Sequence, residues 1–217
     1  GLKLTAVSPR ADVRDALVSH DGLHLSQLRQ GARVATSSLR RQALLRSERP
    51  DLEILPLRGN VDTRLGKLET ENLDAIVLAS AGLERLGLDE HISERLDPER
   101  FVPAAGQGVM ALVSRQDDPV TEDLLSGLED PESREAITAE RSALAELGGG
   151  CRIPFGAWAR WEGERFILDG VVAHPETGGP IRSRVERTEV GGEDMGRELA
   201  AALLKGGGEA ILKEVMA

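Results

Sequence analysis

The first half of the chain repeats a pattern in which a short apolar segment is followed by a stretch with helical spacing. Three predicted strands and three predicted helices alternate in the order Ala32–Thr36, Leu39–Glu48, Leu52–Leu57, Val61–Thr70, Leu73–Ala79 and Ala81–Leu86. Ser37 and Ser38 can cap the first of these helices, and Pro50 ends it. This alternation predicts a parallel-rich α/β sheet that binds ligands at the carboxyl ends of its strands.

The pattern changes to period two near residue 130, so we expect a second, α+β module with a small antiparallel sheet there. Its predicted strands are Ala157–Trp161, Arg165–Ala173 and Ile181–Glu189, and its predicted helices are Pro131–Leu147, Met195–Leu204 and Ala210–Val215. Outside both modules, Leu2–Val7 and Val109–Ser114 are predicted strands, Ala11–Asp15 is a polar segment, and Thr121–Leu128 is a predicted helix.

The composition narrows the choice of partner. The 217 residues carry a formal net charge of -10, yet many of the 27 basic residues are Arg concentrated between Arg29 and Arg64. With no Tyr, two Trp and three Phe, the chain offers few aromatic platforms for nucleic acid. The apolar runs are too short to span a bilayer, so we expect no membrane partner. A focused Arg pocket for a small polyanion fits this pattern better.

Cysteine and histidine usage adds two expectations. The single cysteine, Cys151, excludes an internal disulfide and favours a cytoplasmic location. The four histidines show no metal-ligand spacing beyond His20 and His24, which we interpret as surface structure, so no metal is expected. The chain opens at Gly1 with neither an initiator Met nor a charged leader, which suggests a fragment or a processed product.

Two predicted loops carry arginines at the start of helices. In Thr36-Ser37-Ser38-Leu39-Arg40-Arg41, hydroxyls and free N–H groups lie beside two guanidiniums, an arrangement suited to an anion. Leu57–Arg64 repeats the design with Arg58, Gly59, Asn60 and Arg64. The alternative is that the polar residues only cap the helices and the arginines are solvated. Asp62 is interpreted as a carboxylate at the helix N-terminus rather than as a catalytic acid.

Two glycine-rich segments are less specific. Gly106-Gln107-Gly108 could bring N–H groups to a ligand, although a hinge is an equally good interpretation. Gly148–Gly150 could place Cys151 on an accessible loop, although three glycines after a helix are common at a C-terminal cap, and a lone cysteine is more often inert packing.

Taken together and in order, these segments resemble hydroxymethylbilane synthases (porphobilinogen deaminases). The motifs that carry the resemblance are Thr36–Arg41, Leu57–Asn60 with Thr63-Arg64, Ala81-Gly82-Leu83 with Arg85-Leu86-Gly87, Pro103 with Gly106-Gln107-Gly108, Glu140-Arg141, and Gly149-Gly150-Cys151 with Pro154.

The resemblance implies a three-domain organisation of which the N-terminal lobe is largely missing. Residues 14–108 would form a cleft domain like a lobe of a type II solute-binding protein. Residues 130–217 would form the C-terminal α+β domain that bears the cofactor loop. Residues 1–13 and 109–129 would be remnants of the N-terminal lobe and the hinge, with the two outer strands paired antiparallel.

The resemblance also implies a transferase of heme and porphyrin (tetrapyrrole) biosynthesis. It would condense four porphobilinogen molecules head to tail, releasing ammonia, on a dipyrromethane primer joined to Cys151 by a thioether. The residues implied to bind the carboxylates and pyrroles of cofactor, substrate and growing polypyrrole are Thr36, Ser37, Ser38, Arg40, Arg41, Arg58, Asn60, Arg64, Arg85, Gln107 and Gly108.

The chain departs from the family in one important respect. The family's catalytic aspartate lies in the N-terminal lobe, and no Asp of this chain occupies a matching motif, so we expect no turnover by the chain alone. A separate N-terminal fragment or a strand-swapped copy is the expected protein partner, and otherwise the chain is a monomer. The competing hypotheses are a non-catalytic carboxylate-binding or sensor module, against which Cys151 argues, and, third, a structural or interaction protein, against which the enclosed arginine pattern argues.

Overall fold

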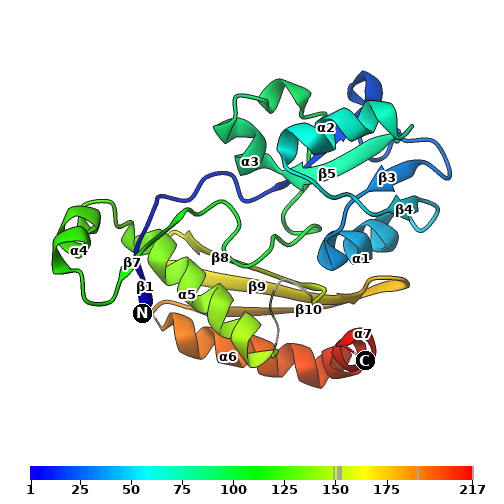
Figure 1. Ribbon diagram of the computed structural model, residues 1–217. Helices are drawn as coiled ribbons and strands as arrows, with labels where there is room; N and C mark the ends of the chain where they lie inside the picture. The colour runs from blue at the N-terminus through cyan, green and yellow to red at the C-terminus, as the bar shows by residue number, and fades with distance from the viewer. Residues whose placement is uncertain (149, 151–152, 190, 217) are drawn as a thin grey trace.

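The computed structural model describes residues 1–148, 150, 153–189 and 191–216, which form a mixed α/β lobe, a C-terminal α+β domain and a projecting arm (Figure 1). The strands are β1 (Leu2–Val7), β2 (Asp15–Ser19), β3 (Arg33–Ala35), β4 (Glu53–Leu55), β5 (Ala75–Ala79), β6 (Glu94–Arg95), β7 (Ala111–Arg115), β8 (Phe155–Glu162), β9 (Arg165–His174) and β10 (Gly178–Arg187). The helices are α1 (Leu39–Glu48), α2 (Val61–Thr70), α3 (Ser80–Arg85), α4 (Pro119–Ser126), α5 (Pro131–Glu146), α6 (Gly192–Leu203) and α7 (Glu209–Met216), with short helical turns η1 (His20–Gly22), η2 (Asp89–His91) and η3 (Leu204–Gly208).

The sheet of the lobe has the strand order β4-β3-β5-β2-β6. Strand β3 is parallel to both β4 and β5, as the alternating pattern predicts, but β2 runs antiparallel to β5 and β6. The sheet is therefore mixed, and the prediction missed its fully buried strand β2. Its three apolar residues are flanked by Asp15 and Ser19, so the segment shows neither a long apolar run nor a clear alternation.

Helices α1 and α2 have the predicted boundaries because their capping residues act as expected. The Ser38 side chain accepts a hydrogen bond from the Arg41 N–H, and the Asn60 side chain accepts one from the Thr63 N–H. Each cap satisfies one of the N–H groups that a first helical turn leaves without a partner.

The C-terminal domain is an antiparallel sheet in the order β10-β9-β8, covered on one face by α5 and α6. Phe166, Leu168, Met195 and Leu199 lie in its core and are fully buried. None of the helices in the part of the chain that the structure describes is long and apolar enough to cross a membrane.

Helix α1 lies between the two sheets (Figure 1). Its Leu44 and Leu45 share a hydrophobic cluster with Leu17 of the lobe and with Val171 of β9. The other face of the lobe sheet packs beneath α2 and α3 in a separate cluster that includes Ile76 and Leu83. The lobe and the C-terminal domain therefore share one of the hydrophobic clusters through α1, while each also has a cluster of its own.

The arm consists of β1, β7 and α4. Strands β1 and β7 pair antiparallel, which confirms the predicted pairing. The arm also exposes apolar side chains. Without a covering lobe, Val109, Leu112 and Leu124 would form an uncovered apolar face; Leu124 is 74% exposed, but Val109 and Leu112 are half-buried. The exposed apolar residues of the arm and the segments next to it are Leu2, Met110, Val113, Val120, Leu124 and Leu128.

Candidate functional site

The two arginine loops meet at the carboxyl ends of the neighbouring parallel strands β3 and β4. The Ser37 hydroxyl donates to the Leu57 carbonyl at 2.8 Å and accepts from the Leu57 N–H at 2.9 Å. Thr36, which is buried, donates its N–H to the carbonyl of Leu55 at 2.8 Å. The loops are thus adjacent, as the sequence predicts, and are joined through Ser37.

A buried carboxylate lies beneath the first loop. Asp15, the first residue of β2, is fully buried and accepts from both guanidiniums that follow Ser38. Arg40 donates through Nη1 and Nη2 at 2.7 and 3.1 Å, and Arg41 donates through Nε at 2.9 Å, with its Nη2 2.8 Å from the same carboxylate. The Gln107 amide donates to Asp15 at 3.0 Å. Nothing in the sequence pattern indicates this pairing, because Asp15 is 25 residues from Arg40.

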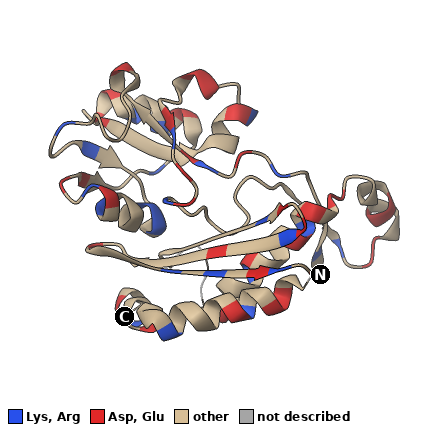
Figure 2. Cartoon of the chain, turned by 180° about the vertical axis from the view of Figure 1, so that it is seen from behind, with Lys and Arg blue, Asp and Glu red and all other residues tan. Residues whose placement is uncertain are grey.

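The cluster keeps a positive charge. Burial alone would raise the pKa of Asp15, but the two guanidiniums hold it well below its usual range. One carboxylate beside two guanidiniums leaves an excess of one positive charge. Arg64 of the second loop is close enough to contribute to a lowering of the pKa of Arg41, whose main cause is burial. Elsewhere, basic and acidic residues are interspersed, as Figure 2 shows for one side of the molecule.

A cavity of about 340 Å³ opens beside this cluster. Its polar lining contains Ser38, Arg40, Arg41 and Gln107, four of the residues implied to bind cofactor and substrate. Arg40 is 3% exposed, and its Nε is a buried donor without a partner among the described residues. The remaining lining residues are small or apolar: Ala104, Ala105, Leu144, Gly150, Ile153 and Phe155. Guanidinium and amide donors beside apolar surface suit a ligand that combines carboxylates with flat rings.

Cys151 lies outside the described residues, so its position is not part of this geometry. Its sequence neighbours Gly150 and Ile153 nevertheless both line the cavity. The chain on either side of Cys151 therefore reaches the arginine cluster. Among the described residues, no group of three His, Asp or Glu side chains is arranged to hold a metal ion.

The loop that contains Gln107 crosses between the lobe and the arm. Besides Asp15, the Gln107 amide donates to the Val13 carbonyl at 2.7 Å. Gly108 has a φ of 89°, and a Cβ at this position would lie 2.7 Å from the carbonyl oxygen of Ala11, so a side chain is excluded. The Gly108 carbonyl accepts from Arg85 at 2.8 Å. Arg85 thus binds the crossing segment rather than lining the cavity.

Glu140, in α5, anchors the same loop from the C-terminal domain. Its fully buried carboxylate accepts from the Gly106 N–H at 2.6 Å, from the Ala159 N–H at 2.8 Å and from both terminal nitrogens of Arg10. Burial raises the pKa of Glu140 despite these donors. In the sequence, Glu140 is part of a motif to which no role could be assigned. In the structure its carboxylate joins β8, α5 and the loop around Gln107.

The second arginine loop is open to solvent. Arg58 and Asn60 are exposed, and Arg64 is half-buried with its Nε bonded to the Gly59 carbonyl at 2.8 Å. None of these three lines the 340 Å³ cavity. Asp62 is exposed in the first turn of α2, in agreement with its interpretation as a residue of the helix N-terminus.

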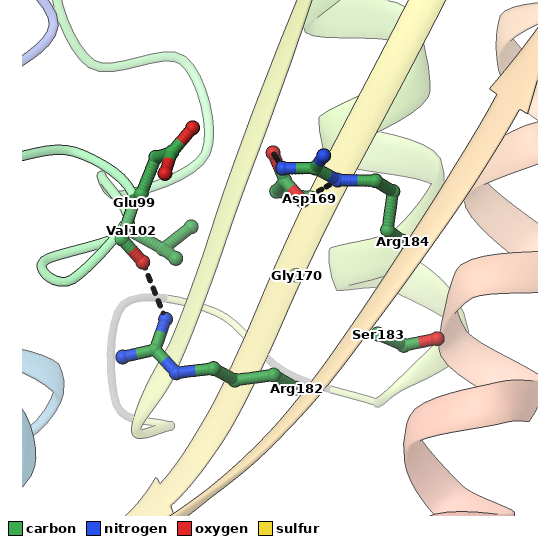
Figure 3. Close-up of a pocket in the computed structure, with 7 residues that line it drawn as sticks. All are labelled: Glu99, Val102, Asp169, Gly170, Arg182, Ser183 and Arg184. Atoms are coloured by element: carbon green, nitrogen blue, oxygen red, sulfur yellow. Dashed lines mark hydrogen bonds and ion pairs between the residues drawn. The ribbon is translucent and has the colours of Figure 1, made fainter.

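A further cavity of about 360 Å³ lies between the segment around Glu99 and the strands β9 and β10 (Figure 3). Its arginines already have partners. Arg182 donates to the carbonyls of Glu99 and Arg100 at 2.7 and 2.6 Å, and Arg184 is paired with Asp169 at 2.6 Å. The bonds of Arg182 hold the lobe against the C-terminal sheet, and the Arg184–Asp169 pair joins β10 to β9 within that sheet, so the 340 Å³ cavity is the better candidate site.

Comparison with known proteins shows a family match over both halves of the chain. The family description "Porphobilinogen deaminase, dipyromethane cofactor binding domain" matches residues 1–123, and "Porphobilinogen deaminase, C-terminal domain" matches residues 134–205. The chain is similar to the porphobilinogen deaminase of Roseiflexus castenholzii, with 50% identity over 95% of this chain and 68% of the relative. Those of Xanthomonas campestris pv. campestris (46%) and Acidithiobacillus ferrooxidans (45%) align over 98% and 99% of this chain and 70% of each relative.

Proposed function

This chain belongs to the porphobilinogen deaminase family, and we propose that its 340 Å³ cavity binds the dipyrromethane cofactor and the growing polypyrrole of hydroxymethylbilane synthesis. The family's enzymes are transferases, and this reaction joins four porphobilinogen molecules head to tail with release of ammonia. One observation carries the proposal: the cavity unites Ser38, Arg40, Arg41 and Gln107 with Gly150 and Ile153, which flank Cys151 in the sequence.

The residues of the cavity fit the cofactor. Each pyrrole unit carries two carboxylates, and a carboxylate that loses water without gaining a partner is costly. The cluster around Asp15 has an excess of one positive charge, and Arg40 Nε is a donor without a described partner. Ala105, Leu144 and Phe155 supply apolar surface for pyrrole rings. Ser38 and Gln107 add neutral hydrogen-bonding groups.

We assign the covalent attachment to Cys151. When bound, the dipyrromethane supplies the pyrrole carbon to which the first porphobilinogen is joined. The arginines of this chain then hold carboxylates and orient the bound pyrroles, while the apolar lining excludes water. Arg58, Asn60 and Arg64 lie at the neighbouring open loop, where they can meet carboxylates of pyrrole units beyond the cavity.

Release of ammonia requires an acid near the leaving amine. Among the described residues that line the cavity there is no carboxylic acid, and Asp15 behind them stays ionised because of its lowered pKa. We therefore propose that the acid belongs to a separate structural element, as the family resemblance implies for its N-terminal lobe. Turnover would then require that element to be present.

The arm is proposed to belong with such an N-terminal lobe. Residues 1–13 and 109–129 would be its remnants, residues 14–108 a lobe of the solute-binding type, and residues 130–217 the cofactor-bearing domain. The exposed Val113 and Leu124 support a covering partner, either an N-terminal fragment or a strand-swapped copy. Hydrogen exchange in a dilute monomer tests this: β5 should be protected far better than β7, and equal protection would contradict it.

The single cysteine also bears on the compartment. A thiol that must remain free for thioether formation is best preserved where thiols stay reduced. We therefore propose a cytoplasmic location. Porphobilinogen and the polypyrrole are the proposed small-molecule partners.

A mass measurement tests the cofactor assignment. The chain is incubated with preformed hydroxymethylbilane, and the intact mass and the reaction with an aldehyde pyrrole reagent are recorded. We expect a covalent dipyrromethane adduct that is absent from the Cys151→Ser variant. An equal adduct in that variant would contradict the assignment of Cys151. No adduct with either protein, even when an N-terminal fragment is supplied, would favour the carboxylate-binding module instead.

A further inference from the structure

Asp15 lies behind the polar side chains of the 340 Å³ cavity and accepts hydrogen bonds from three of them. It is the first residue of β2, and its carboxylate accepts from three side chains: Arg40, Arg41 and Gln107. All three line the 340 Å³ cavity, whereas Asp15 itself does not. A residue in this place touches every polar side chain of the cavity except Ser38, without being available to a ligand.

We propose that Asp15 is the positioning residue of this site: it fixes the guanidiniums of Arg40 and Arg41 in the orientation in which they receive a pyrrole carboxylate. The proposal rests on the proposed function of the cavity. The proposal adds the residue that orients Arg40 and Arg41 before a ligand binds.

The geometry explains why the arginines need such a residue. Two adjacent guanidiniums repel each other, and both are largely buried, so without a counter-charge one would turn toward water. Asp15 engages Nη1 and Nη2 of Arg40 as a fork and Nε and Nη2 of Arg41. The carbonyls of Val102 and Val77 accept from the remaining faces at 2.7 and 3.1 Å. Each planar group is thereby held from two directions.

The arrangement still leaves capacity for an anion. Among the described residues Arg40 Nε has no partner, and the Arg41 side chain is 11% exposed. The excess positive charge remains beside the cavity, and the guanidiniums need not reorganise when a carboxylate binds. Such preorganisation increases affinity because the cost of ordering the side chains is met during folding.

A charge-balancing role and a positioning role of Asp15 predict opposite effects of Asp15→Asn on anion binding. If Asp15 served only to balance charge, its removal would raise the positive charge of the site and strengthen the binding of an anion. If it positions the arginines, the same change weakens binding. Asp62→Asn is the matched control, because it removes one negative charge from an exposed residue on α2 without touching Arg40 or Arg41.

The experiment measures porphobilinogen binding by calorimetry to the wild-type chain, Asp15→Asn and Asp62→Asn. We expect binding at least about 10-fold weaker for Asp15→Asn and unchanged or slightly tighter for Asp62→Asn. A folded Asp15→Asn protein that binds as tightly as the control overturns the proposal. If Asp15→Asn does not fold, Asp15→Glu replaces it: the charge is retained but displaced by one methylene, and binding must again weaken.

A second readout needs no ligand and separates this proposal from the proposed function. The Nε–H signals of Arg40 and Arg41 in nitrogen-15 NMR should exchange slowly in the wild type and rapidly in the folded Asp15 variant. Slow exchange in both proteins refutes a positioning role. Failure of wild-type binding, with the expected NMR result, refutes the cavity as the porphobilinogen site and leaves the role of Asp15 in place.

Discussion

The two arginine loops are built alike and end up in different environments. Each follows one of two neighbouring parallel strands, each begins a ten-residue helix with a side-chain cap, and each contributes two arginines. In the first loop, Arg40 and Arg41 are buried against Asp15. In the second, Arg58 is exposed and Arg64 only half-buried.

The difference arises outside the loops. The antiparallel strand β2 places Asp15 beneath the first loop, and β8 of the C-terminal domain covers it, with Gly156 so close that a Cβ there would lie 3.0 Å from Arg40 Cδ. Neither strand reaches the second loop in this way. The same local design therefore yields a fixed anion receptor in one place and adaptable surface arginines in the other.

The largest contrast is expected when one arginine is removed from each loop. Arg40→Gln removes one of the two guanidiniums that balance the negative charge of the buried Asp15 carboxylate, so we expect the free energy of unfolding to fall by about 3–5 kcal/mol. Arg58→Gln, at an exposed site, should change it by less than about 0.5 kcal/mol. Urea unfolding of both variants checks this, and similar losses would mean that the two loops are energetically equivalent.

Acid should reduce the contribution that the ion pairs of Asp15 with Arg40 and Arg41 make to the free energy of unfolding. The pKa of Asp15 is lowered below its usual 3.8 in the folded state, so its contribution is complete above that pH and declines as the pH falls below it. In the Asp15→Asn/Arg40→Gln double variant this component of the decline should be missing. The denaturant midpoints of the wild type and the double variant are measured between about pH 5 and pH 2. Midpoints that fall in parallel for the two proteins would contradict an ionised Asp15.

Lysine substitution should separate geometry from charge. Arg41→Lys keeps the charge but loses the bonds that Nε and the second terminal nitrogen make, so we expect a loss of about 1–3 kcal/mol. A solvated Arg41 would instead tolerate lysine with little change in the free energy of unfolding. Arg64→Lys should cost less than about 0.5 kcal/mol. Thermal melting of Arg41→Lys and Arg64→Lys, each with a porphobilinogen titration, measures the losses of stability and of binding separately. Equal shifts in melting temperature for the two variants would contradict a structural difference between the two loops.

The smallest effects are expected at the helix caps. Asn60→Ala removes a cap of 2.9 Å and should destabilise the chain by about 1 kcal/mol. Ser38→Ala removes a longer contact of 3.4 Å, in a loop that is already held by Asp15, and should cost less. Circular dichroism melting measures both, and a larger loss for Ser38→Ala would show that the first loop depends on its cap.

Features set by residues close together in the sequence could be predicted, whereas contacts between residues far apart in the sequence could not. The boundaries of α1 and α2 could be predicted because Ser38, Asn60 and Pro50 act within a few residues of the helix ends. The adjacency of the two loops followed from the order of parallel strands. The partner of Arg40 could not be found, because it depends on strand β2, whose three apolar residues, 16–18, are too few to reveal a strand. Likewise, Leu144 and Ile153 reach the cavity only through the packing of the C-terminal domain.

The position of α1 between two sheets has a consequence for how the chain unfolds. Leu44 and Leu45 share one core with Leu17 on one side and Val171 on the other, so neither half can melt without exposing this helix to water. Residues 14–108 and 130–217 should therefore lose structure in a single calorimetric transition, with no plateau at which one half survives. Separately expressed halves would each lack part of the shared core and should associate or aggregate instead of folding alone.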